Sequence, residues 1–262
     1  MIRRTRFRRR TFAALAAVAG CVIAATAGAA EVKVLSAAVL KPALNELAPQ
    51  FERATGHTLA LTYESAGVVR KQIEAGEVAD VAIIQKPVVE TLAQQGKIAA
   101  ASVATLARSG VALGVPAGRP KPDVSSVEAL KRSLLAEKSI AYPDPTLGHA
   151  SGIHFRGVLD RLGIRHDVDA KAKLMKGTVA EFAAHDSADL IVSQPMEILA
   201  TPGYELVGWL PEELQDRARF TWSAGVPATA RAAEAGQALI RFLVSPTAAE
   251  IIKRRGMEPG AN

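Results

Sequence analysis

The sequence predicts an α/β protein built as two lobes. Short apolar runs alternate with amphipathic segments in the order strand, helix, strand, helix, strand, which gives a parallel sheet with crossover helices. Further strand–helix units of similar size follow in the second half of the chain. The 262 residues, 49% hydrophobic and 22% charged, suit a packed globular protein of one large or two small domains.

The first half of the chain supplies three predicted strands, each followed by a helix. The strands span 31–36, 57–63 and 80–84, and the helices span 42–54, 67–75 and 87–95. Gly56 and Gly76 end the first two helices, because glycine readily adopts the left-handed conformation found there. A long apolar stretch follows at 103–115.

The second half begins with a helix capped by Ser125 or Ser126. The strands that follow are predicted at 139–143, 173–175 and 189–193, and the helices at 151–162, from near 178, at 231–243 and at 246–255. We expect the chain to return to its first lobe at the end. Lobe I then comprises 31–113 plus 222–262, and lobe II comprises 114–221.

Residues 1–30 have the pattern of an export signal. Arginines precede an apolar stretch at 11–30 that ends in small residues, as signal peptidase requires. Arg9 and Arg10 resemble a twin-arginine motif, and the residues before Cys21 resemble a lipobox, so the export route and lipidation at Cys21 stay open. The alternative is a transmembrane anchor. We expect a periplasmic protein.

Charge and cysteine content exclude several classes of function. The six arginines of the leading segment equal the net charge of +6, so residues 31–262 carry no net charge. Nucleic acid is therefore not an expected partner, because its binding needs a concentrated cationic face. Cys21 is the only cysteine, which excludes disulfides and cysteine-ligated zinc from the mature chain. Neither a metal nor a cofactor is expected.

Small and polar residues stand at four places where a strand ends and a helix begins. These junctions are Ser36-Ala37-Ala38, Ser65-Ala66-Gly67, Ala150-Ser151-Gly152 and Lys176-Gly177-Thr178. In open α/β sheets this edge binds ligands, and the free N–H groups of a helix start favour anions. Gly152 is expected to let a ligand oxygen approach the backbone closely. The alternative is that Ser and Thr only cap their own helices.

Signatures of enzymes are weak. The sequence contains no G-x-S-x-G elbow, H-E-x-x-H, P-loop or G-x-G-x-x-G fingerprint. Four side chains near strand ends are candidates for a general base, namely His149, His154, Asp144 and Glu64. Lys41 and Arg70 follow their junctions closely enough to contact an anion.

Five segments resemble the periplasmic molybdate-binding protein family, which are type II periplasmic solute-binding proteins of ABC transporters. They are VLSAAVLKPAL (34–44), RKQIEAGEVADVAI (70–83), ASGIHFRGVLDRLG (150–163), DLIVS (189–193) and SPTAAEIIKRRGM (245–257). The resemblance covers nearly all of 31–257. It implies two α/β lobes joined by two crossover strands, with the ligand in the cleft between them.

The resemblance also implies which positions bind the ligand. The family's two serines fall on Val39 and Ala66, its backbone N–H donors on Ser151 and Val179, and its tyrosine on Ser193. Because these three hydroxyl-bearing side chains are replaced, we expect a site that is not shaped for molybdate. The predicted ligand-binding residues are Ser36, Ala38, Val39, Ser65, Ala66, Gly67, Arg70, Ser151, Gly152, Val179 and Ser193.

A second likeness is to a divergent branch of this family that includes periplasmic aconitate isomerase. The segments that carry it are KPDVSSVEALKRSLL (121–135), IAYPDP (140–145) and PGYELVGWLPEELQ (202–215). The leading hypothesis is a monomeric solute-binding protein that delivers a small anion, an oxyanion or a di- or tricarboxylate, to an ABC permease. The alternatives are an aconitate isomerase that works by an allylic proton shift, and a protein that presents its ligand to a sensor.

Overall fold

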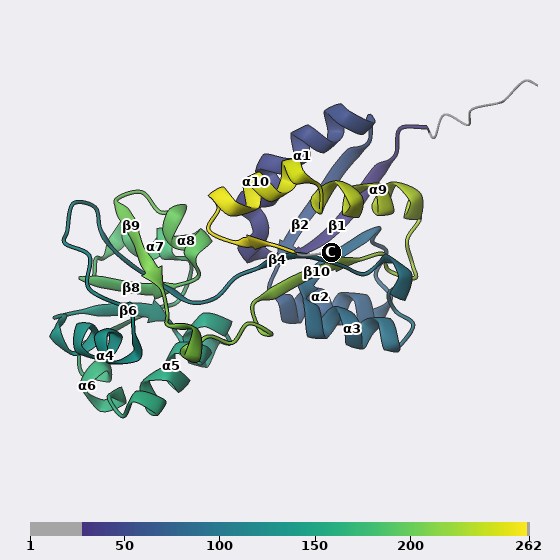
Figure 1. Ribbon diagram of the computed structural model, residues 1–262. Coiled ribbons are helices and arrows are strands. Elements are labelled where there is room, and N and C mark those ends of the chain that lie inside the picture. Colours follow the sequence, from purple (N-terminus) through teal and green to yellow (C-terminus); the bar gives the residue numbers. More distant parts are fainter. Residues whose placement is uncertain (1–27, 261–262) are drawn as a thin grey trace, which may run out of the picture.

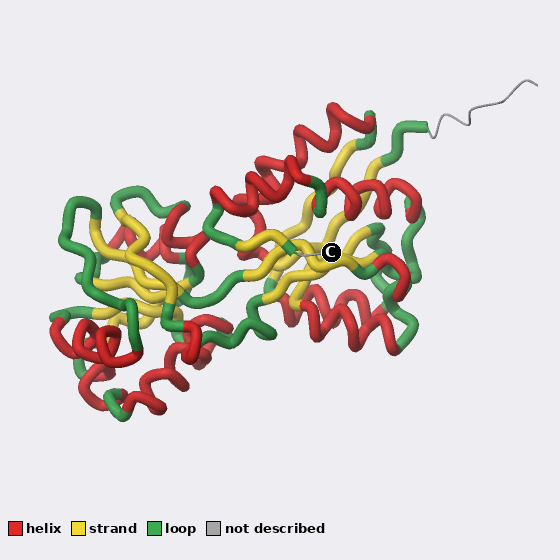
Figure 2. Tube along the Cα trace, in the orientation of Figure 1, coloured by secondary structure: helices red, strands yellow, loops and turns green. Residues whose placement is uncertain are grey.

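The computed structural model describes residues 28–260, in which the strands form two separate sheets joined by loops (Figures 1 and 2). Helices cover both faces of each sheet, so the predicted two-lobed α/β architecture is confirmed. Residues 1–27 of the predicted export segment, Cys21 among them, lie outside the described residues. Within 28–260, no helix is long and apolar enough to cross a membrane.

The first sheet has the strand order β11-β4-β10-β3-β1-β2. Its strands are β1 (Glu31–Ala37), β2 (Thr58–Glu64), β3 (Val81–Gln85), β4 (Ala104–Arg108), β10 (Thr221–Gly225) and β11 (Glu258–Pro259). The three strands β1, β2 and β3 are parallel, as their crossover helices require, whereas β10 runs antiparallel between β3 and β4. The C-terminal strands thus return to the first sheet.

Helices from both ends of the chain cover the first sheet. On one face lie α1 (Lys41–Thr55), α9 (Ala233–Leu243) and α10 (Pro246–Arg254), and on the other lie α2 (Ala66–Ala75) and α3 (Lys86–Gln94) (Figure 1). Buried Asp80 joins the two ends, since its carboxylate accepts hydrogen bonds from the backbone N–H groups of Lys33, Arg231 and Ala232 at 2.7–2.9 Å.

The second sheet has the strand order β7-β6-β8-β5-β9. Its strands are β5 (Ala112–Pro116), β6 (Ile140–Pro143), β7 (Ala172–Met175), β8 (Leu190–Ser193) and β9 (Tyr204–Trp209). The apolar stretch at 103–115 divides between β4 and β5, which belong to different sheets. Ala112 and Leu113, expected in lobe I, therefore pair with β8 and β9 of the second sheet.

Two apolar layers hold the helices of the second lobe on its sheet. One face carries α4 (Val127–Ala136), α5 (Ala150–Leu162) and α6 (Arg165–Asp169), and the other carries α7 (Val179–His185) and α8 (Pro195–Leu199). Phe155 and Leu130 belong to the first layer, and Met175 and Ile198 to the second. Short 3-10 helices complete the fold at Ala38–Leu40, Ala100–Ser102, Pro145–Leu147 and Glu212–Leu214.

The chain crosses between the two sheets twice, and the two crossings are bonded to each other. The backbone N–H of Ser109 donates to the carbonyl of Phe220 at 2.7 Å. Met196 of α8 lies beside this bond, where it accepts from the Ser109 hydroxyl at 3.9 Å. Although α8 covers the second sheet, Met196 is 1% exposed and packs in the apolar core of the first lobe.

Candidate functional site

The carboxyl ends of the parallel strands in each sheet point toward the other lobe. In the first sheet, β3 ends at Gln85 opposite Trp222, directly after the second crossing. In the second sheet, β8 ends at Ser193 opposite Ala112, directly after the first crossing. Both sheets therefore present the edge at which open α/β folds bind ligands. We call these facing strand ends, with the first turns that follow them, the interlobe edge.

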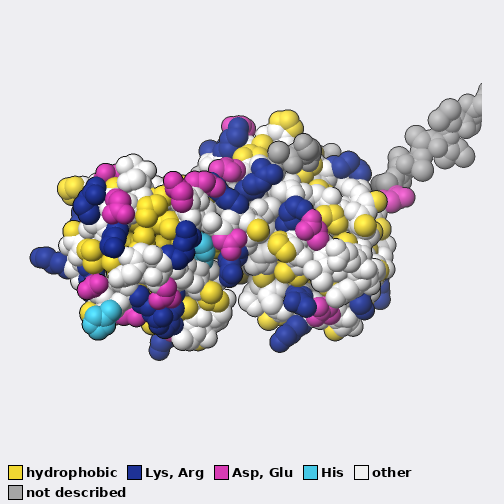
Figure 3. All heavy atoms as spheres, turned by 60° about the horizontal axis from the view of Figure 1, so that its bottom comes forward, with side chains coloured by type: hydrophobic (Ala, Val, Ile, Leu, Met, Phe, Trp, Pro, Cys, Tyr) yellow, Lys and Arg dark blue, Asp and Glu magenta, His cyan; other side chains and the backbone are white. Residues whose placement is uncertain are grey.

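The surface narrows at the junction of the lobes, and charged side chains gather beside it. Basic, acidic and histidine side chains lie next to one another there on the face shown in Figure 3. Residues 28–260 therefore place both positively and negatively charged side chains close to the interlobe edge.

In the first lobe, the predicted site residues fall on adjacent strand ends. Ser36 is fully buried in β1, in register with Tyr63 of β2, and its hydroxyl donates to the carbonyl of Ala37 at 3.3 Å. Ala38 and Val39 form the 3-10 helix that follows β1. The remaining predicted residues follow β2, at the start of α2 and in its second turn: Ser65, Ala66, Gly67 and Arg70.

In the second lobe, the predicted residues also fall on neighbouring strand ends. Strand β6 pairs with β7 on one side and with β8 on the other. Ser151 and Gly152 lie in the first turn of α5 after β6, and Val179 is the first residue of α7 after β7. Ser193 ends β8 and is fully buried. The structure thus brings these four residues to one edge.

Two of the four junctions are occupied by caps. The hydroxyl of Ser65 accepts from the N–H of Val68 at 3.3 Å, which caps α2. Thr178 and Glu181 form a capping box at the start of α7, with bonds of 2.8 and 3.2 Å. These hydroxyls satisfy their own helices, so the alternative of plain capping holds for Ser65 and Thr178.

The start of α5 differs from those of α2 and α7. Its N-cap residue is His149, and within the described chain no side chain caps this 13-residue helix. The first N–H groups of a helix have no partner inside it, and the helix dipole places partial positive charge there. This helix start is therefore an anion-binding element at the interlobe edge, and among the described residues the segment that follows β1 also has no side-chain cap.

Gly152 has a packing role that the sequence analysis did not foresee. A Cβ atom at this position would lie 1.9 Å from the carbonyl oxygen of Pro143, the last residue of β6. This packing is a second reason for glycine at position 152, and the expected approach of a ligand oxygen stays a prediction. The missing side chain lets the first turn of α5 lie directly on the end of β6.

The corner between β8 and α8 holds a carboxyl group that the sequence analysis missed. The Ser193 hydroxyl donates to the carboxylate of Glu197, and Gln194 between them is 6% exposed, with no partner for its Oε1 among the described residues. Burial raises the pKa of Glu197, while the Ser193 hydroxyl, His149 and the Gln194 backbone oppose that shift. Glu197 stands four positions after Ser193, but Ser193 ends a strand and α8 begins only at Pro195, so no helical spacing in the sequence reveals the pair.

The predicted acid–base residues have different roles in the structure. His154 bonds the carbonyl of Leu214 at 2.7 Å, and burial lowers its pKa, so it serves the packing of the second lobe. Asp144 accepts from the hydroxyl and the N–H of Thr146, and these bonds lower its pKa. His149 acts electrostatically on both Asp144 and Glu197. Only His149 therefore remains as a histidine suited to the interlobe edge.

The predicted cations lie on the surface of the first lobe with partners. Arg70 is paired with Glu74 at 2.8 Å, one turn along α2. The Lys41 ammonium lies 5.7 Å from the centre of the Tyr63 ring. Both side chains are exposed, and an anion would have to compete with these partners.

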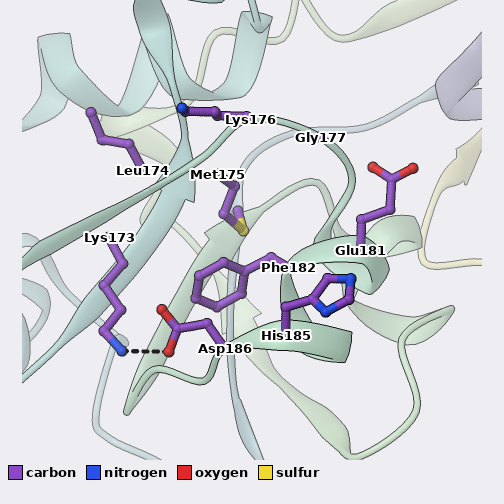
Figure 4. A pocket seen from close by; sticks show the side chains of 9 residues that line it. All are labelled: Lys173, Leu174, Met175, Lys176, Gly177, Glu181, Phe182, His185 and Asp186. Carbon is purple, nitrogen blue, oxygen red and sulfur yellow. Dashed lines mark hydrogen bonds and ion pairs between the residues drawn. The ribbon is translucent and has the colours of Figure 1, made fainter.

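A cavity of about 430 Å³ lies in the second lobe, between the edge strand β7 and α7 (Figure 4). Lys173 and Asp186 close one end with a 2.7 Å bond, Phe182 lines the middle, and Lys176 stands at the other end. Neither Ser151 nor Ser193 lines it. In residues 28–260, no three His, Cys, Asp or Glu side chains cluster closely enough to hold a metal ion.

Two α/β lobes with facing strand ends and a double crossing define a two-lobed binding protein. A family model described as bacterial extracellular solute-binding protein matches residues 32–258, and the chain belongs to this family. The chain is 30% identical to an aconitate isomerase of a Pseudomonas species over 233 residues, which cover 86% of this chain and 87% of the relative.

Molybdate-binding proteins are also similar to this chain. The molybdate-binding protein ModA of Azotobacter vinelandii is 28% identical over 247 residues, which cover 90% of this chain and 92% of the relative. The solved structure of the periplasmic molybdate-binding protein of the same organism has a TM-score of 0.67 at 22% identity, and the match covers 86% of this chain and 98% of the other. The predicted family resemblance is confirmed.

Proposed function

We propose that this chain is a periplasmic binding protein for a small organic anion, which it delivers to an ABC permease as a monomer. The observation that carries the proposal is the uncapped start of α5 at the interlobe edge, in a chain of the extracellular solute-binding family. Backbone N–H groups there, with the hydroxyl of Ser151, supply neutral donors to a carboxylate. Closure of the lobes would bring the first-lobe strand ends to the other side of the ligand.

A carboxylate is favoured over molybdate by the side chains at the edge. The family resemblance implies that Val39 and Ala66 replace two serines of the molybdate-binding proteins, and neither side chain offers a hydroxyl. The first-lobe hydroxyls that remain are Ser36, which donates to the Ala37 carbonyl, and Ser65, which caps α2. A tetrahedral oxyanion such as molybdate would therefore lack hydroxyl donors on the side of the first lobe.

Calorimetry on residues 31–262 tests this proposal. The panel is molybdate, sulfate, malate, succinate, citrate and trans-aconitate. We expect a carboxylate from this panel to bind at least tenfold more tightly than molybdate, a difference of about 1.4 kcal/mol. Failure of every anion to bind would refute the proposal, and tight molybdate binding would refute the choice of ligand.

A second candidate function is isomerisation of aconitate. Two observations favour it, the 30% identity to an aconitate isomerase and the presence of Glu197 and His149 together at the interlobe edge. A carboxylate and an imidazole can remove and return the proton of an allylic shift. Incubation of the protein with trans-aconitate, followed by NMR for the cis isomer, tests this function directly. Binding of trans-aconitate without conversion would leave the transport function standing alone.

A further inference from the structure

The corner between β8 and α8 has polar groups whose bonding is incomplete. One carboxylate oxygen of Glu197 accepts the Ser193 hydroxyl, and the Gln194 carboxamide next to it has a buried oxygen with no partner in the described chain. Glu197 is only partly buried, although enough protein surrounds it to raise its pKa. The Gln194 backbone also bonds this carboxyl group, which remains partly exposed, so a ligand at this corner can reach it.

The charged groups around this corner leave Glu197 with one electrostatic partner. Strands β5 and β8 carry no charged side chain. On β9, Glu205 pairs with Lys121, and Tyr204 accepts from the N–H of Ala188. On α7, Glu181 caps its own helix, and His185 lines the separate cavity beside β7.

On the first lobe, Arg255 precedes Gly256, where an added Cβ would lie 3.0 Å from the Pro195 side chain. Arg255 forms bonds of 2.6 and 3.0 Å with Glu46. Among residues 28–260, His149 is the one side chain whose charge acts on Glu197, and it favours the ionised carboxylate. No fixed cation is therefore bonded to the Glu197 carboxylate among the described residues.

A bound anion and an ionised Glu197 would repel each other in this enclosed corner. Two carboxylates that share such a site do not both stay ionised, because each disfavours the charge on the other. We propose that Glu197 is a specificity-determining residue, and that a bound anion shares one proton with its carboxyl group. The proposal rests on the proposed binding of a small anion at the interlobe edge.

This sharing defines the class of ligand. A hydroxy acid brings its own donor, which an ionised Glu197 accepts, so it binds without a change in protonation. Sulfate and succinate have only acceptors when fully ionised, so they bind only when Glu197 takes up a proton from solvent. The site therefore selects hydroxycarboxylates over anions that cannot donate a hydrogen bond.

The test compares malate with succinate and sulfate by calorimetry between pH 6.5 and 9. Malate and succinate differ only by one hydroxyl group. We expect the Kd of sulfate and succinate to rise with pH, by up to tenfold per unit in the upper part of the range, with a flatter dependence for malate. Glu197→Gln should remove this rise, and it should bring malate and succinate within about threefold of each other at pH 9.

Two control variants distinguish the effect of Glu197 on binding from the effects of other titratable side chains. Glu128→Gln removes the same charge from an exposed site on α4 and should leave every Kd within about twofold of the wild type. His149→Gln tests the other titrating group, and the rise above pH 7.5 should persist in it. Wild-type affinities for sulfate and succinate that do not change with pH would overturn the proposal, even if Glu197→Gln fails to fold.

The result also distinguishes this inference from the proposed function. Anion binding with no dependence on pH or on Glu197 would overturn the inference and leave the binding function intact. Absence of binding by all three anions and by the rest of the calorimetric panel would refute both.

Discussion

The side-chain amide of Gln215 forms two hydrogen bonds with the backbone of Val111. It accepts from the Val111 N–H at 3.0 Å and donates to the Val111 carbonyl at 2.9 Å, and it also donates to Leu210 at 3.1 Å. Val111 and Leu210 belong to the two opposite crossings between the lobes. The Gln215 side chain in the second crossing therefore bonds the backbone of the first crossing in the way that a neighbouring β-strand would.

Gln215→Ala should destabilise the protein by about 2–4 kcal/mol, because the Val111 N–H and the Leu210 carbonyl lose their partners, while the Val111 carbonyl keeps only the Leu210 N–H. Urea unfolding measures the change. Gln94→Ala, at an exposed position near the end of α3, is the control and should stay within about 0.5 kcal/mol of the wild type. Equal stability of the two variants would show that water replaces the Gln215 amide without cost.

Gly152→Ala should destabilise the second lobe, because its Cβ would overlap the Pro143 carbonyl at 1.9 Å. We expect a loss of about 2 kcal/mol or more. Gly157→Ala is a matched control in the same helix, since its Cβ would meet nothing within 4 Å, and it should stabilise α5 by about 0.5–1 kcal/mol. Thermal unfolding of both variants distinguishes tight packing from a general effect of glycine replacement.

Ser65→Ala and Ser151→Ala should affect different properties. Loss of the Ser65 cap should cost about 0.5–1 kcal/mol of stability, because the N–H of Val68 loses the hydroxyl and keeps only the Ser65 carbonyl as its acceptor. Ser151 does not cap α5, so its replacement should instead weaken anion binding by about 0.5–1.5 kcal/mol, the contribution of one neutral hydrogen bond. Calorimetry and chemical unfolding on both variants would contradict this assignment if the two effects were exchanged.

The ion pairs of Glu46 should make stability depend on pH. Hydrogen bonds from Arg255 and then Arg254 lower the pKa of Glu46, so the folded state favours its ionised form. This stabilisation is complete above the unfolded pKa of about 4.3 and is lost as pH falls through the lower folded pKa.

We expect Glu46→Gln to be about 0.5–1 kcal/mol less stable than the wild type at pH 7, with the difference shrinking below about pH 4. Urea unfolding at a series of pH values measures it. High salt should reduce the same difference, because the side chain is 30% exposed. A difference that grows as pH falls would contradict the assigned sign.

The sequence predicts the helices and strands in which apolar side chains recur at a regular spacing. Helix α1 and strand β2 follow the predicted ranges to within a residue or two, because apolar side chains recur at helical spacing and glycines end the helices. Strand β10 was not predicted, because TWSAG is buried along its whole length and shows no alternation. Helix α8 has five residues, too few to display a helical period.

The sequence predicts where the four strand–helix junctions lie, but not which of them are capped or tightly packed. The T-x-x-E pattern that begins at Thr178 is a sequence signature of a capping box and would have identified that junction as capped. The contact of Gly152 with Pro143 and the enclosure of Glu197 depend on packing between segments distant in sequence. Periodicity along one segment contains no information about such contacts.

Met196 and Glu197 are consecutive residues of one short helix, and they face different parts of the molecule. Met196 packs in the core of the first lobe, whereas Glu197 lies at the corner where the second lobe would meet a ligand. Because the two residues are adjacent in one helix, a ligand bound at Glu197 acts on the segment that anchors α8 in the first lobe. Methionine is unbranched and flexible, so it can stay inserted while the lobes rotate. Helix α8 can therefore act as the pivot of lobe motion, which links occupancy of the site to the angle between the lobes.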